Sequence, residues 1–101
     1  MELDKKKSPR HHLRQSAIVS VLGTAAPGVP GEILNLSEGG AQMRLDQPLG
    51  YASLVRIEYD DNLLLGEVVY CQEEQEAGWL VGISVEHALL GLKARAHMGG
   101  R

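Results

Sequence analysis

Residues 41–46 read Ala-Gln-Met-Arg-Leu-Asp, in which an apolar side chain alternates with a polar one. Successive side chains of a β-strand point to opposite faces, so this period of two predicts a strand with one dry face and one wet face. Pro48 and Gly50 follow and predict a turn. β-sheet is therefore the starting hypothesis for the whole chain.

Further segments rich in β-branched and apolar residues lie on both sides of this strand, each bounded by turn-forming residues. These segments are residues 15–22, 32–36, 54–59, 63–71 and 79–85. Gly66 interrupts the fifth strand and predicts a bulge or bend where the sheet curls. Six strands in so short a chain predict an all-β fold, a small six-stranded antiparallel β-barrel, because closure removes exposed edges.

The two ends of the chain differ from this pattern. Residues 1–9 are lysine-rich and stop at Pro9, which predicts a flexible N-terminal arm. Residues 87–97 place apolar side chains on one helical face and predict a short C-terminal helix, although Gly91 weakens it. The expected organisation is an arm at 1–9, one barrel domain at 10–97 and a tail at 98–101.

Composition narrows the classes of function. The 101 residues suffice for one modest core, and the net charge of −3 disfavours a protein that coats nucleic acid. Cys71 is the only cysteine, which excludes an internal disulfide and a cysteine-based zinc site. There is no signal-like apolar run and no segment long enough to span a bilayer, so we expect a cytoplasmic protein without membrane insertion.

Two short strings combine into a candidate binding surface. One is Arg10-His-His-Leu-Arg14 and the other is Asn35-Leu-Ser-Glu-Gly-Gly40. If the first strand folds back beside the second, these strings meet in one patch. An arginine fork can hold a guanine edge or a phosphate, Asn35 offers a donor and an acceptor, and Ser37 offers a hydroxyl. The combination predicts a nucleotide-sensing surface.

Ordinary structural roles compete with this interpretation. The arginines alone fit a solvated basic tail, and Asn-x-Ser with two glycines also fits a turn in which Gly supplies a positive φ. The four histidines lack metal-ligand spacing, and there is no Gly-x-Ser-x-Gly elbow, so we expect neither a metal site nor an enzyme. Tyr59, Tyr70 and Trp79 are interpreted as core or barrel-wall residues.

The order Arg-x-x-x-Arg, strand, Asn-x-Ser-x-x-Gly, four more strands and a short helix resembles the PilZ domain family, which binds the bacterial second messenger cyclic di-GMP. The resemblance extends from Arg10 to about His97. Residues 66–70 and 82–85 also resemble the family's later strands, although an aromatic residue is commoner where Ser84 or Val85 stands.

The resemblance implies a role for each motif position. Arg10 and Arg14 would close over the ligand and bind guanine edges and phosphates. Asn35 and Ser37 would face guanine and phosphate, and Gly40 would permit a tight turn and a close approach. His12 and Gly39 would be neighbours of the ligand. No catalytic residue, metal or cofactor is implied, and the number of ligand molecules stays open.

The implied function is a receptor or adaptor that orders its Arg-x-x-x-Arg segment over cyclic di-GMP and signals to an unidentified protein partner. Two alternatives remain. One is a similar adaptor that binds a protein but no nucleotide. The other is a small barrel that binds oligonucleotides, which would need interleaved basic and aromatic residues. With four scattered aromatic residues and an acidic balance, we expect no DNA or RNA partner.

Overall fold

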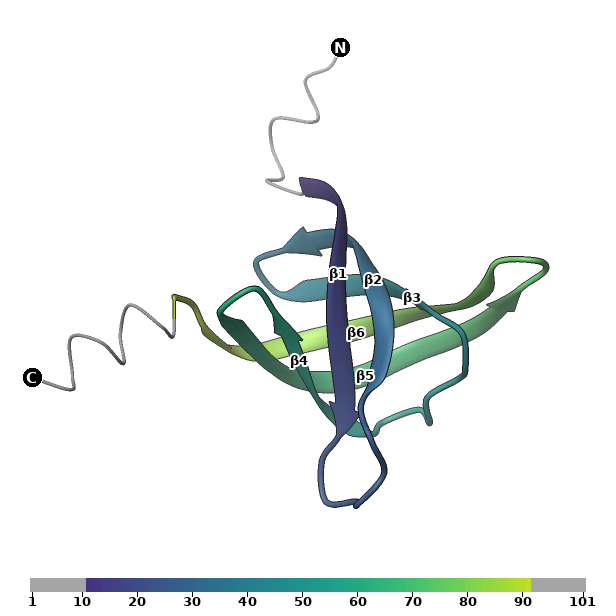
Figure 1. Ribbon diagram of the computed structural model, residues 1–101, viewed down its shortest axis with the longest axis horizontal. Coiled ribbons are helices and arrows are strands. Elements are labelled where there is room, and N and C mark those ends of the chain that lie inside the picture. Colours follow the sequence, from purple (N-terminus) through teal and green to yellow (C-terminus); the bar gives the residue numbers. More distant parts are fainter. Residues whose placement is uncertain (1–10, 92–101) are drawn as a thin grey trace, which may run out of the picture.

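The computed structural model describes residues 11–91, which form six β-strands. The strands are β1 (His11–Val21), β2 (Val29–Ser37), β3 (Gly40–Leu45), β4 (Leu54–Tyr59), β5 (Asn62–Glu74) and β6 (Gly78–Leu89). They close into an antiparallel barrel in the order β1-β2-β3-β6-β5-β4 (Figure 1). The predicted all-β class and strand number are confirmed.

The barrel interior is filled by aliphatic side chains from all six strands, and no polar side chain of the described residues is buried in it. On β3, Ala41, Met43 and Leu45 point inward, while Gln42 and Arg44 lie on the outer face. The period of two therefore predicted both faces of this strand. Burial of these apolar groups supplies the main stabilisation of the fold.

Strand register creates a row of residues across the outer face of the barrel. His12 lies opposite Asn35, Asn35 opposite Gln42, Gln42 opposite Gly82, and Gly82 opposite Tyr70. Register shifts next to this row, in β1, β2 and β5, bring these five positions into line. Residues as distant in sequence as 35 and 70 thus share one surface.

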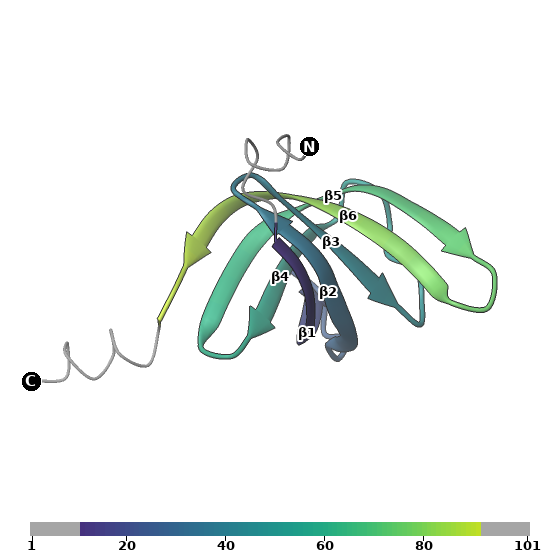
Figure 2. The ribbon, with the colours of Figure 1, turned by 90° about the horizontal axis from the view of Figure 1, so that it is seen from above.

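The long β5–β6 hairpin arches over one side of the barrel, with β1 and β2 on the other side (Figure 2). The pairing of these strands shifts between Leu65 and Gly66, which confirms the irregularity predicted at Gly66. Within residues 11–91 there is no helix long and apolar enough to cross a membrane.

The expected C-terminal helix is wrong over its first residues. His87–Leu89 continue β6 and pair with Leu63–Leu65 of β5, because an available strand edge satisfies their backbone groups. Residues 92–97 of that expected helix, the arm at 1–9, Arg10 and the tail at 98–101 lie outside the described residues.

Candidate ligand-binding site

An open groove of about 410 Å³ lies on the outer face of the barrel beside the β2–β3 turn. Its lining consists of Asn35, Ser37, Gly39, Gly40, Ala41, Gln42, Val69, Tyr70, Gly82, Ile83 and Ser84. The predicted site residues of the Asn-x-Ser-x-x-Gly string are thus brought together on one surface. Small-molecule sites typically have volumes of about 300–1,000 Å³, so the groove has room for such a ligand.

A chain of side-chain hydrogen bonds runs along the groove. Asn35 Nδ2 donates to Gln42 Oε1 at 2.7 Å, and Gln42 Nε2 donates to the Tyr70 hydroxyl at 2.8 Å. This relay joins β2, β3 and β5 across the face of β6. It holds the Asn35 amide in a fixed orientation, so the polar wall of the groove is preorganised.

Tyr70 reaches this relay because Gly82 lies beneath its ring. A Cβ atom at position 82 would overlap the Tyr70 ring, so glycine is required for this close approach. Tyr70 is 39% exposed and lines the groove. Of the two roles expected for Tyr70, the structure supports the barrel wall and not the core, while Tyr59 and Trp79 do pack against the core.

Asn35 leaves one polar atom without a partner. Its Oδ1 is buried and accepts no hydrogen bond from the described residues. An unsatisfied buried acceptor costs about 1–3 kcal/mol, so the site favours an N–H donor at this point. A guanine edge or an arginine side chain carries such donors.

The glycines after Ser37 are not explained by backbone geometry. Neither Gly39 nor Gly40 has a positive φ, in contrast to Gly23, Gly78 and Gly91. A Cβ atom at Gly39 would meet no atom within 4 Å, and one at Gly40 would come no closer than 3.5 Å to the Ile83 carbonyl oxygen. The predicted turn is present, because Glu38 and Gly39 form the tight turn from β2 to β3 and Gly40 pairs with Ser37 directly after it, but neither glycine supplies a positive φ. The missing side chains also leave the groove floor open.

Arg14 lies on β1 outside this groove. Its side chain is 76% exposed, and its Nε is 3.5 Å from Glu32 Oε2. The β1–β2 register shift between His12 and Gln15 includes Arg14, so the motif strand bulges next to the site. The structure therefore places the strand that carries Arg14 beside Asn35, but the Arg14 guanidinium points toward the Glu32 carboxylate.

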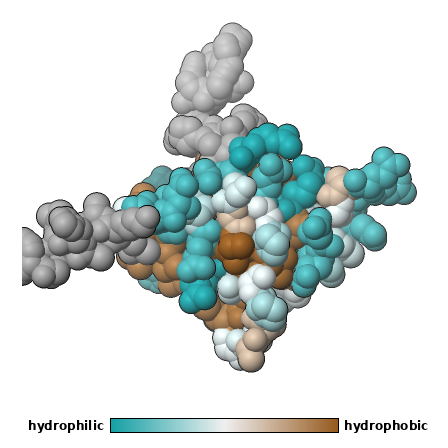
Figure 3. Space-filling model, viewed as in Figure 1, coloured by the Kyte–Doolittle hydropathy of each residue, from teal (hydrophilic) through white to brown (hydrophobic). Residues whose placement is uncertain are grey.

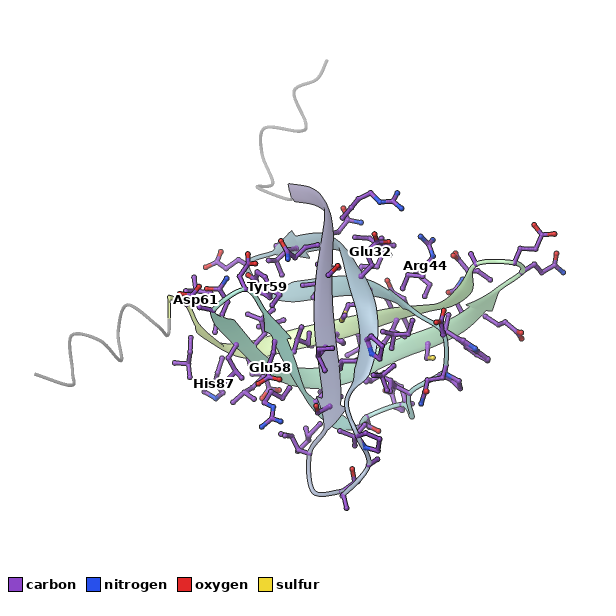
Figure 4. All side chains as sticks on the ribbon, in the orientation of Figure 1. Glu32, Arg44, Glu58, Tyr59, Asp61 and His87 are labelled. Atoms are coloured by element: carbon purple, nitrogen blue, oxygen red, sulfur yellow. The ribbon has the colours of Figure 1, made fainter. Side chains whose placement is uncertain are left out.

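The groove lining carries no charged side chain. Acidic residues adjoin the lining, since Glu38 lies between Ser37 and Gly39 and Glu67 lies opposite Ser84. Arg44 Nη2 is paired with Glu74 Oε1 at 2.9 Å, and Figure 4 labels Arg44 and Glu32 on neighbouring strands. An anionic ligand in the groove therefore needs cations supplied from beside it.

Desolvation by burial and, secondarily, the Asp60 carboxylate raise the pKa of Tyr59, which does not line the groove. Within residues 11–91, no cluster of His, Cys, Asp or Glu is arranged to hold a metal ion.

A closed six-stranded barrel with a preorganised polar groove on its outer face defines a small β-barrel binding domain. The family model described as PilZ domain matches residues 4–95, and the chain belongs to this family. PilZ domains are binding and adaptor domains, in general receptors for cyclic di-GMP that interact with proteins. No curated protein matches this sequence.

Proposed function

We propose that this chain is a cyclic di-GMP receptor in which Arg10 and Arg14 close over a ligand held in the groove. The observation that carries the proposal is the groove at Asn35, Ser37 and the two glycines. Gly39 and Gly40 leave its floor without side chains, although the packing has room for a side chain at both positions. Asn35 Oδ1 in its wall is a buried acceptor without a hydrogen bond from the described residues.

Each group of the groove has a complementary group on the ligand. Asn35 Oδ1 accepts an N–H of guanine, and the Ser37 hydroxyl donates to a phosphate oxygen. The exposed Tyr70 ring offers a face on which a base can stack, which contributes about 1–3 kcal/mol in single-stranded nucleic-acid complexes. The two arginines supply the positive charge that the lining lacks.

Closure over the ligand provides a signal. Arg14 must leave Glu32 before its guanidinium can reach the groove, and β1 already bulges at that position. A dianionic ligand that pairs with Arg10 and Arg14 orders the N-terminal segment against the barrel. The surface created in this way is what a protein partner recognises.

The direct test is isothermal titration calorimetry of the purified chain with cyclic di-GMP, beside GTP and a short single-stranded oligonucleotide. We expect saturable binding of the cyclic dinucleotide alone, and the stoichiometry gives the number of ligand molecules held. Arg14→Ala should weaken binding at least tenfold, because a charge-assisted contact contributes about 1.5–3 kcal/mol. Arg56→Ala is the matched control, since Arg56 does not line the groove.

The other outcomes identify the alternatives. Oligonucleotide binding would identify a nucleic-acid-binding barrel. A folded chain that gives no heat with any of these ligands would favour the adaptor that binds protein alone. One observation supports that adaptor, because Arg14 is paired with Glu32 rather than directed into the groove.

A further inference from the structure

A second surface of the barrel, formed by β1, β4, β5 and β6, shares no residue with the groove. Strand register places its outward side chains in rows, in which Ile18, Glu58, Leu63 and Leu89 are successive neighbours. In the next row Arg56 lies beside Leu65. We name the surface the Arg56 face; its members are Ile18, Leu22, Leu54, Arg56, Glu58, Leu63, Leu65 and Leu89.

The Arg56 face exposes aliphatic side chains that face outward, away from the core. Ile18 and Leu22 are each 40% exposed, Leu54 is 54% exposed and Leu89 is 37% exposed. Figure 3 shows apolar side chains interrupting the hydrophilic surface on the side of the barrel that carries β1. A cluster of this kind, surrounded by polar groups, is typical of an interaction surface.

A pair of opposite charges lies at the centre of these aliphatic residues. Arg56 Nε is 3.8 Å from Glu58 Oε2, on the same strand and two positions apart. Arg56 Nε is also buried and makes no hydrogen bond to the described residues. The face therefore presents one cation and one anion side by side, with one N–H donor that makes no hydrogen bond within the described residues.

We propose that the Arg56 face binds a second copy of this chain. In this dimer a two-fold axis lies in the interface and crosses β4 midway between Arg56 and Glu58. The axis places Arg56 of each copy against Glu58 of the other copy. The same axis places Leu63 opposite Leu65 of the second copy. Each charge gains a second partner from the other copy, and the central leucines are removed from water. This inference is independent of cyclic di-GMP.

The size of the face sets the strength of the dimer. Four strands about 4.8 Å apart and three rows about 6.8 Å apart give a footprint of about 400 Å² per copy. A standard stable interface buries about 800 Å² per partner, so this face supports a transient dimer rather than an obligate one. The groove remains open in the dimer, since none of its lining belongs to the Arg56 face.

The test is sedimentation velocity of the full chain from micromolar to millimolar concentration. We expect the mass to rise from monomer toward dimer. Arg56→Glu and Glu58→Arg each place like charges in opposition and should remain monomeric. An equimolar mixture of the two variants should form a heterodimer, because every contact across the axis is again complementary. Glu73→Arg, outside the face, should dimerise like the wild type.

Circular dichroism and the Tm show whether each variant is folded. A wild-type chain that stays monomeric at every concentration overturns the proposal, and residues 92–101 of the same chain then become the next occupant to test. Variants that dimerise as the wild type does, or a mixture of folded variants that stays monomeric, would place any association on another surface.

Discussion

The guanidinium of Arg14 and the carboxylate of Glu32 are 3.5 Å apart on adjacent strands of the barrel. Arg44, which lies directly opposite Glu32 on the next strand, is paired with Glu74 instead. Glu32 is therefore the acidic partner that Arg14 must leave before it binds an anionic ligand. The ion pair opposes the closure that the proposed function requires.

Glu32→Gln should increase the affinity for cyclic di-GMP by up to about fivefold, because exposed ion pairs contribute about 0.2–1 kcal/mol. Calorimetry at low salt measures the difference, and added salt should reduce it through screening. Glu73→Gln removes the same charge from an exposed position elsewhere and should leave the affinity unchanged. Equal or weaker binding by the Glu32 variant would show that this pair does not restrain Arg14.

Gly40→Ala should weaken ligand binding at least tenfold without loss of stability. The added methyl group enters the groove, whereas the nearest protein atom, the Ile83 carbonyl oxygen, is 3.5 Å from it. Calorimetry and a thermal melt measure the two effects separately. Gly50→Ala, outside the groove, serves as the control. Unaltered affinity in the Gly40 variant would mean that the ligand does not contact this floor.

Tyr70→Ala should reduce affinity about tenfold or more, because it removes a stacking surface that contributes about 1–3 kcal/mol. Tyr70→Phe keeps the ring but deprives Gln42 Nε2 of its acceptor, so we expect a smaller loss. Titration of both variants distinguishes stacking from orientation by the relay. Equal losses in the two variants would assign the effect to the hydroxyl alone.

Ile57→Ala should lower the free energy of unfolding by about 2–5 kcal/mol, because it leaves a cavity in the core. Ile57 is 0% exposed and lies opposite Val19 across β1 and β4. Urea denaturation measures the change. Ile57→Val should cost about 0.5–1.5 kcal/mol, and a similar cost for both variants would show that the barrel closes around the missing atoms.

Sequence reasoning was strongest for the strands. The period of two at residues 41–46 predicted which side chains of β3 point inward, because the side-chain alternation of a strand is a local property. It failed at His87–Leu89, where helical spacing was outweighed by pairing with β5. Local propensity carries no information about a partner strand that lies more than twenty residues away in the sequence.

For the candidate site, residue types alone predicted Asn35, Ser37 and Gly40, because their chemistry suits a nucleotide wherever they meet. Gln42 and Tyr70 were missed as site residues. Neither belongs to a motif, and their places in the groove depend on cross-strand register. The available sequence signal for Tyr70 was Gly82, which lies opposite it. This signal can be interpreted only when the pairing of β5 with β6 is known.

The sequence by itself determined the strand pattern, the family resemblance and the donors and acceptors available to a ligand. Only the tertiary structure decided that Asn35, Gln42 and Tyr70 form one relay, that Gly40 leaves space in the groove floor, and that Arg14 is held by Glu32. The physical reason is closure of the barrel. Its register and bulges fix which distant side chains become neighbours, and a one-residue slip would turn each to the opposite face.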